Sequence, residues 1–569
     1  MKKYLFIIAS MLVVLVGCKK QETGDDASGD NTPAGPVISV TTPKIVDIES
    51  QSQFYEVQFT AKEAWTASAK SLDGAENAVV LPKTSGQAGD VKLKLAFEGI
   101  PEGEPGRVIE LTIKSGNAVE VVRFFQGKVF WTESEEVTEV AKAGGKVNVK
   151  ILTNFVCEVQ KYDSFETWAP VTITKGDHQL DIEFDVAAYS GFDDRSAYVK
   201  ITAEGVDLVV RFYVEQAGSL QLAWTQNFFW GMFPEGTRES ISEVGDYIII
   251  NCGKTTQSTG GALVFNKSDG TYVKTLEIPS CTGITNDDAG NIIVSTGGNY
   301  PLEEGQEYIP LQVFAFTKAQ AAAIIANGTL PEGTAPIISY YNGFYGYGLD
   351  NLRVTGDVTA NAVITLCTSG GYADFYAVDW NIVNGVSTAE ENSYSSYTAL
   401  PNFLPEDYSM GIWTSFAIVA KHTGTSDQSP LYYMGYDNNY NLQYLATPTG
   451  EWAEVFVTGG EGNEGYNCLD TIEWNGHKYI SFAATAYFAW VDWDGDGTYE
   501  HSPGYLYLLN IDDPANPVLE SKYEYWCDPQ NWQYGDNVDV HLSIEGENLV
   551  AYVADSATSQ YMKVVYPKP

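Results

Sequence analysis

The chain has 569 residues and carries 33 Lys and Arg against 74 Asp and Glu, which gives a net charge of −41. Proteins that bind nucleic acid need a basic stripe to neutralise phosphates, so this charge excludes nucleic acid as a partner. The 44% of hydrophobic residues excludes a disordered chain, and the 13% of aromatic residues with 53 glycines favours β structure rich in turns.

The first 18 residues predict a lipoprotein signal. Lys2 and Lys3 precede an apolar run that ends at Val16, shorter than the roughly 18 residues that span a membrane but suited to the core of a secretory signal. The segment Leu15-Val16-Gly17-Cys18 resembles the lipobox of bacterial lipoproteins, which implies that Cys18 is acylated and begins the mature chain. The alternative is a plain signal peptide that contains a cysteine.

Residues 19–36 are rich in Gly, Asp, Thr, Asn and Pro, a composition that cannot bury enough apolar surface to fold. We expect a flexible tether here. Its acidic residues Glu22, Asp25 and Asp26 resemble the export signal that sends lipoproteins of gut Gram-negative anaerobes to the cell surface. The sequence therefore predicts an outer-membrane protein on the cell surface that contacts the membrane through its lipid anchor only.

The next part of the chain is a duplication. Residues 89–97 and 176–184 share one alternating pattern, and Arg107 and Arg195 each precede a second alternating run, at a spacing of about 90 residues. Short alternating runs separated by glycine turns, in units of this length, are typical of Ig-like β-sandwiches. We predict one sandwich over residues 37–128 and a second over residues 129–219.

The first copy also resembles the BACON family. The residues that carry the resemblance are Trp65-Thr66-Ala67, Ser85-Gly86 with Gly89, Arg107, and Gln126-Gly127. The second copy departs from it, because Phe155-Val156-Cys157 stands where the first has Trp65. The family was named for suspected carbohydrate binding. Neither copy has an evident exposed aromatic platform, so we favour a spacer over a binding module.

From residue 220 to residue 569 pairs of apolar runs recur six times, roughly 58 residues apart, which is slightly long for a four-stranded propeller blade. The second run of each pair, read as a third strand, lies at 263–265, 313–316, 375–378, 431–434, 505–509 and 561–565. A turn glycine precedes most first runs, and the fourth unit lacks one. The last unit stops before an outer strand, which residues 220–224 can supply.

We therefore predict an all-β protein with two Ig-like β-sandwiches followed by a six-bladed β-propeller over residues 220–569. A solenoid or a series of further sandwiches is the alternative.

The loops that enter the innermost propeller strands are rich in aromatic residues. The rings predicted to bind a ligand are Trp230, Tyr345, Tyr347, Trp413, Tyr466, Trp526, Trp532 and Tyr534. Rings flanked by Asn and Asp suit sugars, because C–H faces pack on aromatics while hydroxyls bond to amides and carboxylates. The alternative is that the rings pack between blades.

A calcium site is predicted in the loop between the second and third strands of the fifth unit. Carboxylates at positions 1, 3 and 5, a glycine at 6, a carbonyl at 7 and an acid at 9 give a hard cation an oxygen cage. The ligands would be Asp492, Asp494, Asp496, Thr498 and Glu500. Pro503 stands where an EF-hand needs Glu, and the segment looks more like the short calcium loops inserted in β-propellers. A solvated acidic hairpin is the alternative.

Catalysis has weaker support in the sequence. Asp350, Asp470 and Asp539 recur near the entrances to inner strands, where the acids of a propeller enzyme could sit, but such residues more often start strands and turns. We therefore expect a non-catalytic surface lipoprotein of a polysaccharide-utilisation system. Its partners would be a polysaccharide or oligosaccharide and an outer-membrane transporter complex. The alternatives are a propeller glycoside hydrolase or lyase, and an adhesion or scaffold protein that binds another protein.

Overall fold

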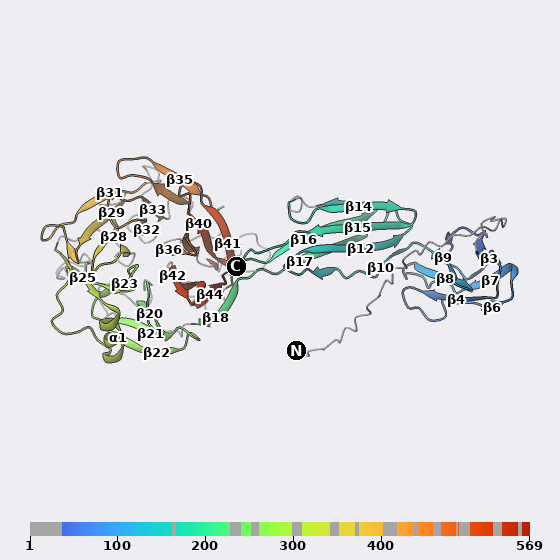
Figure 1. Cartoon of the computed structure of the whole chain (residues 1–569), viewed down its shortest axis with the longest axis horizontal. Helices are drawn as coiled ribbons and strands as arrows, with labels where there is room; N and C mark the ends of the chain where they lie inside the picture. Colours follow the sequence, from blue (N-terminus) through green and yellow to red (C-terminus); the bar gives the residue numbers. More distant parts are fainter. Residues whose placement is uncertain are drawn as a thin grey trace, which may run out of the picture.

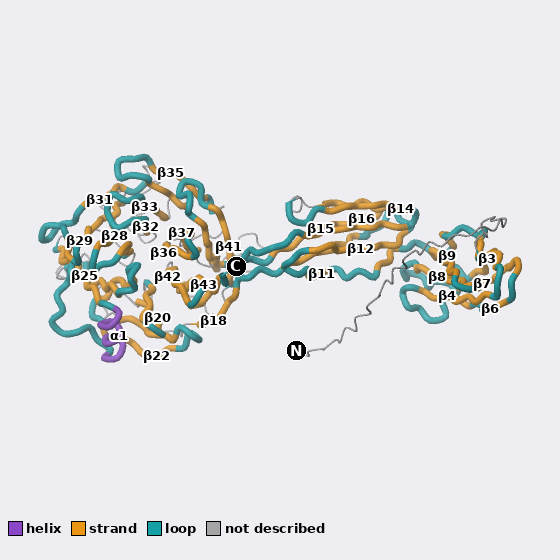
Figure 2. Tube along the Cα trace, viewed as in Figure 1, coloured by secondary structure: helices purple, strands orange, loops and turns teal. Residues whose placement is uncertain are grey.

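The computed structural model describes residues 37–161, 167–227, 240–251, 261–298, 310–341, 352–369, 375–401, 418–435, 441–458, 468–484, 487–488, 501–526, 538–555 and 560–568. These residues form 44 strands and one α-helix, so the predicted all-β fold is confirmed (Figure 2). Figure 1 shows two sandwiches in a row and a ring of sheets beside the second of them. The signal, the tether and Cys18 lie outside the described residues.

The first sandwich packs two sheets around one apolar core. One sheet consists of β1 (Ile38–Val40), β3 (Gln53–Ala61), β7 (Gly89–Phe97) and β5 (Val79–Val80). The other consists of β2 (Ile45–Ile48), β9 (Ala118–Gln126), β8 (Arg107–Ser115), β4 (Trp65–Ser71) and β6 (Ser85–Gly86). Trp65 is buried in the core, and a Cβ on Gly86 would lie 2.6 Å from its Nε1, so the position beside this ring accepts only glycine.

The second sandwich repeats the strand order of the first, as the duplication predicts. One sheet consists of β10 (Phe130–Thr132), β12 (Gly145–Thr153), β15 (Gln179–Val186) and β14 (Val171–Gly176). The other consists of β11 (Val137–Glu139), β17 (Val209–Gln216), β16 (Arg195–Ala203) and β13 (Cys157–Lys161). In each copy one short strand pairs in parallel with the last long one, β2 with β9 and β11 with β17.

Two joints connect these parts. Between the sandwiches, Val108 and Phe125 of the first pack with Val129 and Leu152 of the second. Between the second sandwich and the ring, Phe192 meets the ring of Tyr566 edge-on at a centroid distance of 5.1 Å. Beside it Asp193 accepts hydrogen bonds from the backbone N–H of Lys522, at 2.7 Å, and from the hydroxyl of Ser521. The joint between the second sandwich and the ring therefore combines apolar burial with directional polar contacts.

The ring contains six antiparallel sheets that follow one another along the chain (Figure 1). From the centre outward, the first sheet consists of β19 (Ile241–Val244), β20 (Tyr247–Asn251), β21 (Gly261–Asn266) and β22 (Tyr272–Glu277), and the second of β23 (Cys281–Asn286), β24 (Ile292–Thr296), β25 (Leu311–Phe316) and β26 (Ile338–Tyr340). The third sheet consists of β27 (Arg353–Gly356), β28 (Asn361–Ser369), β29 (Phe375–Val383) and β30 (Val386–Ser387), with β31 (Ser396–Ala399) also on β29, and the fourth of β32 (Ile418–His422), β33 (Leu431–Gly435), β34 (Leu442–Leu445) and β35 (Trp452–Phe456). The fifth sheet consists of β36 (Asp470–Trp474), β37 (His477–Ala484), β40 (Gly504–Asn510) and β41 (Val518–Tyr525), and the sixth of β42 (Val538–Glu545), β43 (Asn548–Asp555), β44 (Gln560–Tyr566) and β18 (Gln221–Asn227).

The innermost strands meet around the centre of the ring: β19 contacts both β23 and β42, and β36 also contacts β42. The last sheet is closed by the strand that enters the ring, because β18 pairs antiparallel with β44 from Gln221 opposite Val565 to Asn227 opposite Gln560. The prediction that the run at residue 220 supplies the missing outer strand is therefore confirmed. This strand order is the one expected of a six-bladed propeller.

The fourth sheet corrects one assignment made from the sequence. The run 431–434 lies in β33, the second strand of its sheet, whereas the apolar pattern predicted a third strand. Of the run before it, Ile418 and Val419 lie in β32, the innermost strand. This shift explains why the fourth unit lacked the glycine of a turn between first and second strands, such as Gly245 with φ +56° or Gly476 with φ +80°.

Helix α1 (Lys318–Asn327) follows β25 and lies on the outside of the ring (Figure 1). Thr317 and Gln320 form a capping box at its start, and Gly328 ends it with φ +85°. Two small strands, β38 (Tyr487–Phe488) and β39 (His501–Ser502), pair with each other between β37 and β40. None of the described helical residues forms a segment long and apolar enough to cross a membrane.

Candidate functional site

The innermost strands define two faces of the ring. We call the face where these strands begin the loop face, and the face where they end and turn into the second strands the turn face. The sequence analysis assigned the predicted aromatic ligands to the loop face. Seven of the eight lie outside the described residues: Trp230, Tyr345, Tyr347, Trp413, Tyr466, Trp532 and Tyr534.

Trp526 is the predicted ring that the structure describes. It follows β41 and precedes β42, and it is 55% exposed. Its indole Nε1 donates to Glu524 Oε1 at 2.6 Å, and its backbone carbonyl accepts from Gln560 Nε2 at 3.0 Å. The indole is therefore held by Glu524 of the preceding strand and the backbone by the neighbouring sheet, while about half of the residue is exposed to solvent.

The predicted calcium ligands Asp492, Asp494, Asp496, Thr498 and Glu500 all lie outside the described residues, as does Asp350. Within the described ranges, no group of three or more His, Cys, Asp and Glu side chains is arranged to hold a metal ion.

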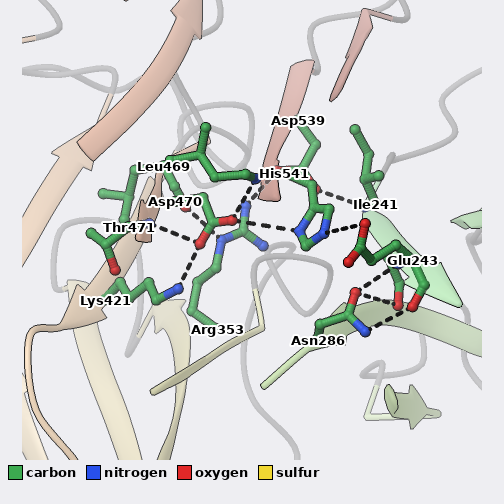
Figure 3. A network of polar contacts seen from close by, with 12 residues as sticks. Ile241, Glu243, Asn286, Arg353, Lys421, Leu469, Asp470, Thr471, Asp539 and His541 are labelled. Atoms are coloured by element: carbon green, nitrogen blue, oxygen red, sulfur yellow. Dashed lines mark hydrogen bonds and ion pairs between the residues drawn. The ribbon is translucent and has the colours of Figure 1, made fainter. Parts of the chain in front are cut away.

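Two acids that the sequence analysis considered for catalysis meet at the centre of the ring (Figure 3). Asp539 of β42 pairs with Arg353 of β27, with 2.5 Å between Asp539 Oδ1 and Arg353 Nη2, and each side chain is only 4% exposed. Asp539 Oδ2 accepts from the backbone N–H of Ile241 at 2.8 Å. Arg353 Nε donates to the carbonyl of Leu469 at 2.9 Å. This pair joins four of the six sheets across the centre.

Asp470, the first residue of β36, is also bonded to a buried cation and to a backbone N–H group, as Asp539 is. Lys421 Nζ lies 2.6 Å from Asp470 Oδ1, and the backbone N–H of Leu542 donates to Oδ2 at 2.8 Å. His541 Nδ1 lies 3.5 Å from the same Oδ2. Burial alone would raise the pKa of Asp470, but Lys421, His541 and the Leu542 amide outweigh it and hold the pKa far below its usual range. Asp470 therefore stays ionised as a structural anion.

On the turn-face side of these ion pairs lies a pocket of about 540 Å³. Its buried floor contains Asp470, Lys421 and His541, and its exposed rim carries Lys318, Glu473 and Lys478. Glu243 and Asn286 line the side formed by β19 and β23. Arg353 crosses the centre on the loop-face side of this floor, at the start of β27. The pocket and the loop face are thus separated by a layer of buried ion pairs.

Glu243 is held from two directions. Lys267 Nζ lies 2.8 Å from Glu243 Oε2, and Asn286 Oδ1 accepts from the Glu243 backbone N–H at 2.6 Å. Burial raises the pKa of Glu243, but His541 and Lys267 together lower it further, so the carboxylate remains ionised.

His541 stands between Asp470 and Glu243 (Figure 3). Its side chain is 10% exposed, and Nε2 is 3.9 Å from Glu243 Oε2, beyond hydrogen-bond distance. Nε2 is buried without a hydrogen-bond partner.

The sequence analysis missed Arg353, Lys421 and His541. The signal that could have revealed them is a single charged or polar residue inside a short apolar strand, as in Leu352-Arg353-Val354 and Val540-His541-Leu542. Such a residue must find a partner on another strand, because burying an unpaired charge is costly.

Comparison with known proteins shows no matching family model and no matching curated protein. A protein of unknown function from Bacteroides thetaiotaomicron is 13% identical, with a match that covers 77% of this chain and 98% of that chain at a TM-score of 0.33. A DUF4221-family protein from Bacteroides vulgatus is 11% identical over 61% of this chain and 99% of that chain, also at a TM-score of 0.33.

A Bacteroides ovatus GH5 xyloglucanase in complex with an XXXG heptasaccharide is 14% identical. That match covers 19% of this chain and only 22% of the xyloglucanase, at a TM-score of 0.14. Likeness at these TM-scores carries no argument about function.

Proposed function

We propose that this chain is a non-catalytic, lipid-anchored protein of the outer membrane that binds glycan on the loop face of a β-propeller. The observation that carries the proposal is the ring of Trp526, which is 55% exposed at the loop face. Exposed, immobilised indole rings provide the flat apolar surface on which the C–H face of a sugar packs. The other predicted rings would extend this surface around the same face.

The bonding of the central acids supports binding over catalysis. A glycoside hydrolase needs one carboxyl group that can give a proton and a second that can act as base or nucleophile, about 5 to 9 Å apart. Asp470 and Asp539 are each paired with a buried cation and with a backbone N–H of a neighbouring sheet. Each of their four oxygens already accepts a hydrogen bond or faces a cation, so we assign both residues a structural role.

The N-terminal half fits the role of a spacer. In the proposal, the lipobox-like Cys18 anchors the chain, the tether of residues 19–36 leaves the surface, and the two BACON-like sandwiches hold the ring away from it. The packed joints at Val108 and Phe192 support a stiff arm, because flexible linkers would let the ring fall back to the membrane. In this proposal, an outer-membrane transporter complex receives the bound glycan.

Affinity gel electrophoresis tests the proposal. The full-length chain, purified in detergent, should be retarded by at least one polysaccharide in a panel of plant and host glycans. Trp526→Ala should weaken the retardation several-fold, and Trp230→Ala with Trp532→Ala should weaken it further. Tyr272→Ala, which removes a 44% exposed ring on the outer strand β22, is the matched control and should have no effect.

If no glycan retards the chain, or if the tryptophan variants behave like the unaltered chain, the proposal is wrong. Release of reducing sugar from any of these glycans would instead favour the enzyme alternative.

A further inference from the structure

The pocket on the turn face is distinct from the proposed glycan surface. Trp526 precedes the start of β42, whereas the pocket is lined by His541, Leu542, Ser543 and Ile544 near its end. The buried pair of Arg353 and Asp539 lies between the two. A ligand in this pocket would therefore not contact the loop face, and the two sites can be tested separately.

The charges at the floor of the pocket already balance each other. Lys421 is paired with Asp470, and Lys267 is paired with Glu243. Asp287 and Asp288 also line the pocket, and their carboxylates accept hydrogen bonds from the backbone N–H groups of Val358 and Gly356. A charged ligand would therefore find these groups already bonded, and it would have to lose its hydration on entry, which is costly without a free counter-charge. The floor therefore favours a neutral ligand.

His541 Nε2 is an unsatisfied buried polar atom in the pocket, and it indicates that a ligand binds there. The residue is 8% exposed and lines the pocket, and this nitrogen has no partner. Nδ1 faces the Asp470 carboxylate, and Nε2 faces the Glu243 carboxylate from 3.9 Å, too far for a hydrogen bond. A buried polar atom of this kind costs free energy until a partner reaches it. A hydroxyl group can be that partner whether or not Nε2 carries a proton, because a hydroxyl both donates and accepts.

The remaining polar groups of the pocket both donate and accept. Lys421 has further N–H groups beyond the one directed at Asp470, and Thr471 and Ser543 carry hydroxyls. Hydroxyl groups of a ligand match such a mixture, because each can donate to one neighbour and accept from another. Tyr479 and Ile472 add apolar wall on which C–H groups can pack.

We propose that this pocket binds a neutral, polyhydroxylated molecule of one or two sugar rings, with one ligand hydroxyl hydrogen-bonded to His541 Nε2. The volume of about 540 Å³ lies within the range of small-molecule sites. The buried His541 and Lys421 fix the orientation of the ligand, and the exposed Lys478 and Glu473 border its entrance.

Calorimetric titration of the full-length chain in detergent tests this site. The probes are glucose, galactose, mannose, xylose, their common disaccharides and myo-inositol, with glucosamine and galacturonate as charged counterparts. At least one neutral probe should bind saturably, and the charged counterparts should bind more weakly. His541→Phe should weaken binding at least tenfold, whereas His541→Gln, which restores a polar atom near the position of Nε2, should recover part of it.

Trp526→Ala separates this site from the proposed glycan surface, since it should leave sugar binding in the pocket unchanged. Binding that is lost in Trp526→Ala and kept in His541→Phe would overturn the inference while supporting the loop-face site. Failure of every neutral probe to bind, or tighter binding of a charged counterpart, would also overturn it.

The imidazole ¹⁵N resonances of the unaltered chain provide a second measurement if His541→Phe does not fold. The bound sugar should shift the Nε2 resonance of a buried histidine. His422, the other buried histidine among those whose burial the structure describes, has both ring nitrogens bonded within the protein and should not respond. A sugar that binds without moving any histidine resonance would show that the pocket is not its site.

Discussion

At the scale of single residues, the centre of the ring is held by charges that come from distant parts of the sequence. Arg353 reaches Leu469, 116 positions away, and Asp539, 186 positions away. Arg353 and Asp539 neutralise each other's charge in the buried centre of the ring, where each side chain is only 4% exposed. Such a pair adds little stability compared with apolar residues, but losing one partner leaves a buried charge alone.

Asp539→Ala should therefore be severely destabilising, by about 3 to 5 kcal/mol, because it leaves the Arg353 guanidinium unpaired. Differential scanning calorimetry should show a Tm of the ring lowered by several degrees or more. Asp512→Ala is the matched control: it removes the partner of His477 in an ion pair that is about half exposed, and it should leave the Tm nearly unchanged. Equal effects of the two substitutions would contradict the structural role of Asp539.

At the scale of elements, the strands that the sequence predicts are those with an apolar pattern set by burial. In the sandwiches one face of each strand is covered, so β3 and β8 alternate and were found from period two. In the ring the second and third strands are covered on both faces, so β43 is almost continuously buried and appears as an apolar run.

The sequence predicted innermost strands but gave them no residue ranges, because β27 and β36 are short and carry the polar residues of the centre. The apolar start of β32, Ile418-Val419-Ala420, resembles a second strand and produced the shift in the fourth unit. The sequence indicated Asp470 and Asp539 but not the cations that pair with them. Those partners are distant in the sequence, and only closure of the ring brings them near the two acids.

Ring closure by β18 makes a prediction at this scale. A chain that begins at residue 228 lacks β18 and leaves the edge of β44 unpaired, with free N–H and C=O groups that can pair with another chain. It should aggregate on size-exclusion chromatography and unfold at a lower temperature than a chain that begins at residue 220. If the two fragments behave alike, β18 is not needed to close the last sheet.

The acidic loop of residues 492–500 provides a second prediction. If it binds calcium, EDTA should lower the Tm of the full-length chain, and readdition of calcium should restore it. Asp494→Ala should remove the response to EDTA, whereas Asp512→Ala, in a different acidic turn, should not. A Tm that EDTA does not change would dismiss the site.

At the scale of the whole molecule, one histidine adds a charged contact to the apolar joint between the sandwiches. His178 Nε2 lies 2.7 Å from Asp47 Oδ2 of the first sandwich, and Nδ1 lies 2.7 Å from Asp177 Oδ1. Burial alone would lower the pKa of His178, but hydrogen bonds with Asp177 and Asp47 outweigh it and raise the pKa above its usual 6.5. Burial alone would raise the pKa of Asp47, but Asn154 and His178 lower it below 3.8.

The joint should therefore be tightest between pH 3.8 and pH 6.5, where Asp47 is ionised and His178 is protonated. Because the raised pKa belongs to the closed joint, its contribution is lost as the pH rises through that pKa. Small-angle scattering should show a wider spread of sandwich orientations at pH 9 than at pH 6. His178→Asn, which tolerates the φ of +58° at this position and carries no charge, should remove the pH dependence.

The central claim is that the ring retains a glycan without cutting it. Size-exclusion chromatography of the full-length chain, after overnight incubation with a polysaccharide that retards it in the affinity gel, tests both halves of this claim at once. We predict that the glycan elutes with the protein and keeps its original chain length. Glycan that elutes apart from the protein, or that is recovered as shorter fragments, would contradict the account.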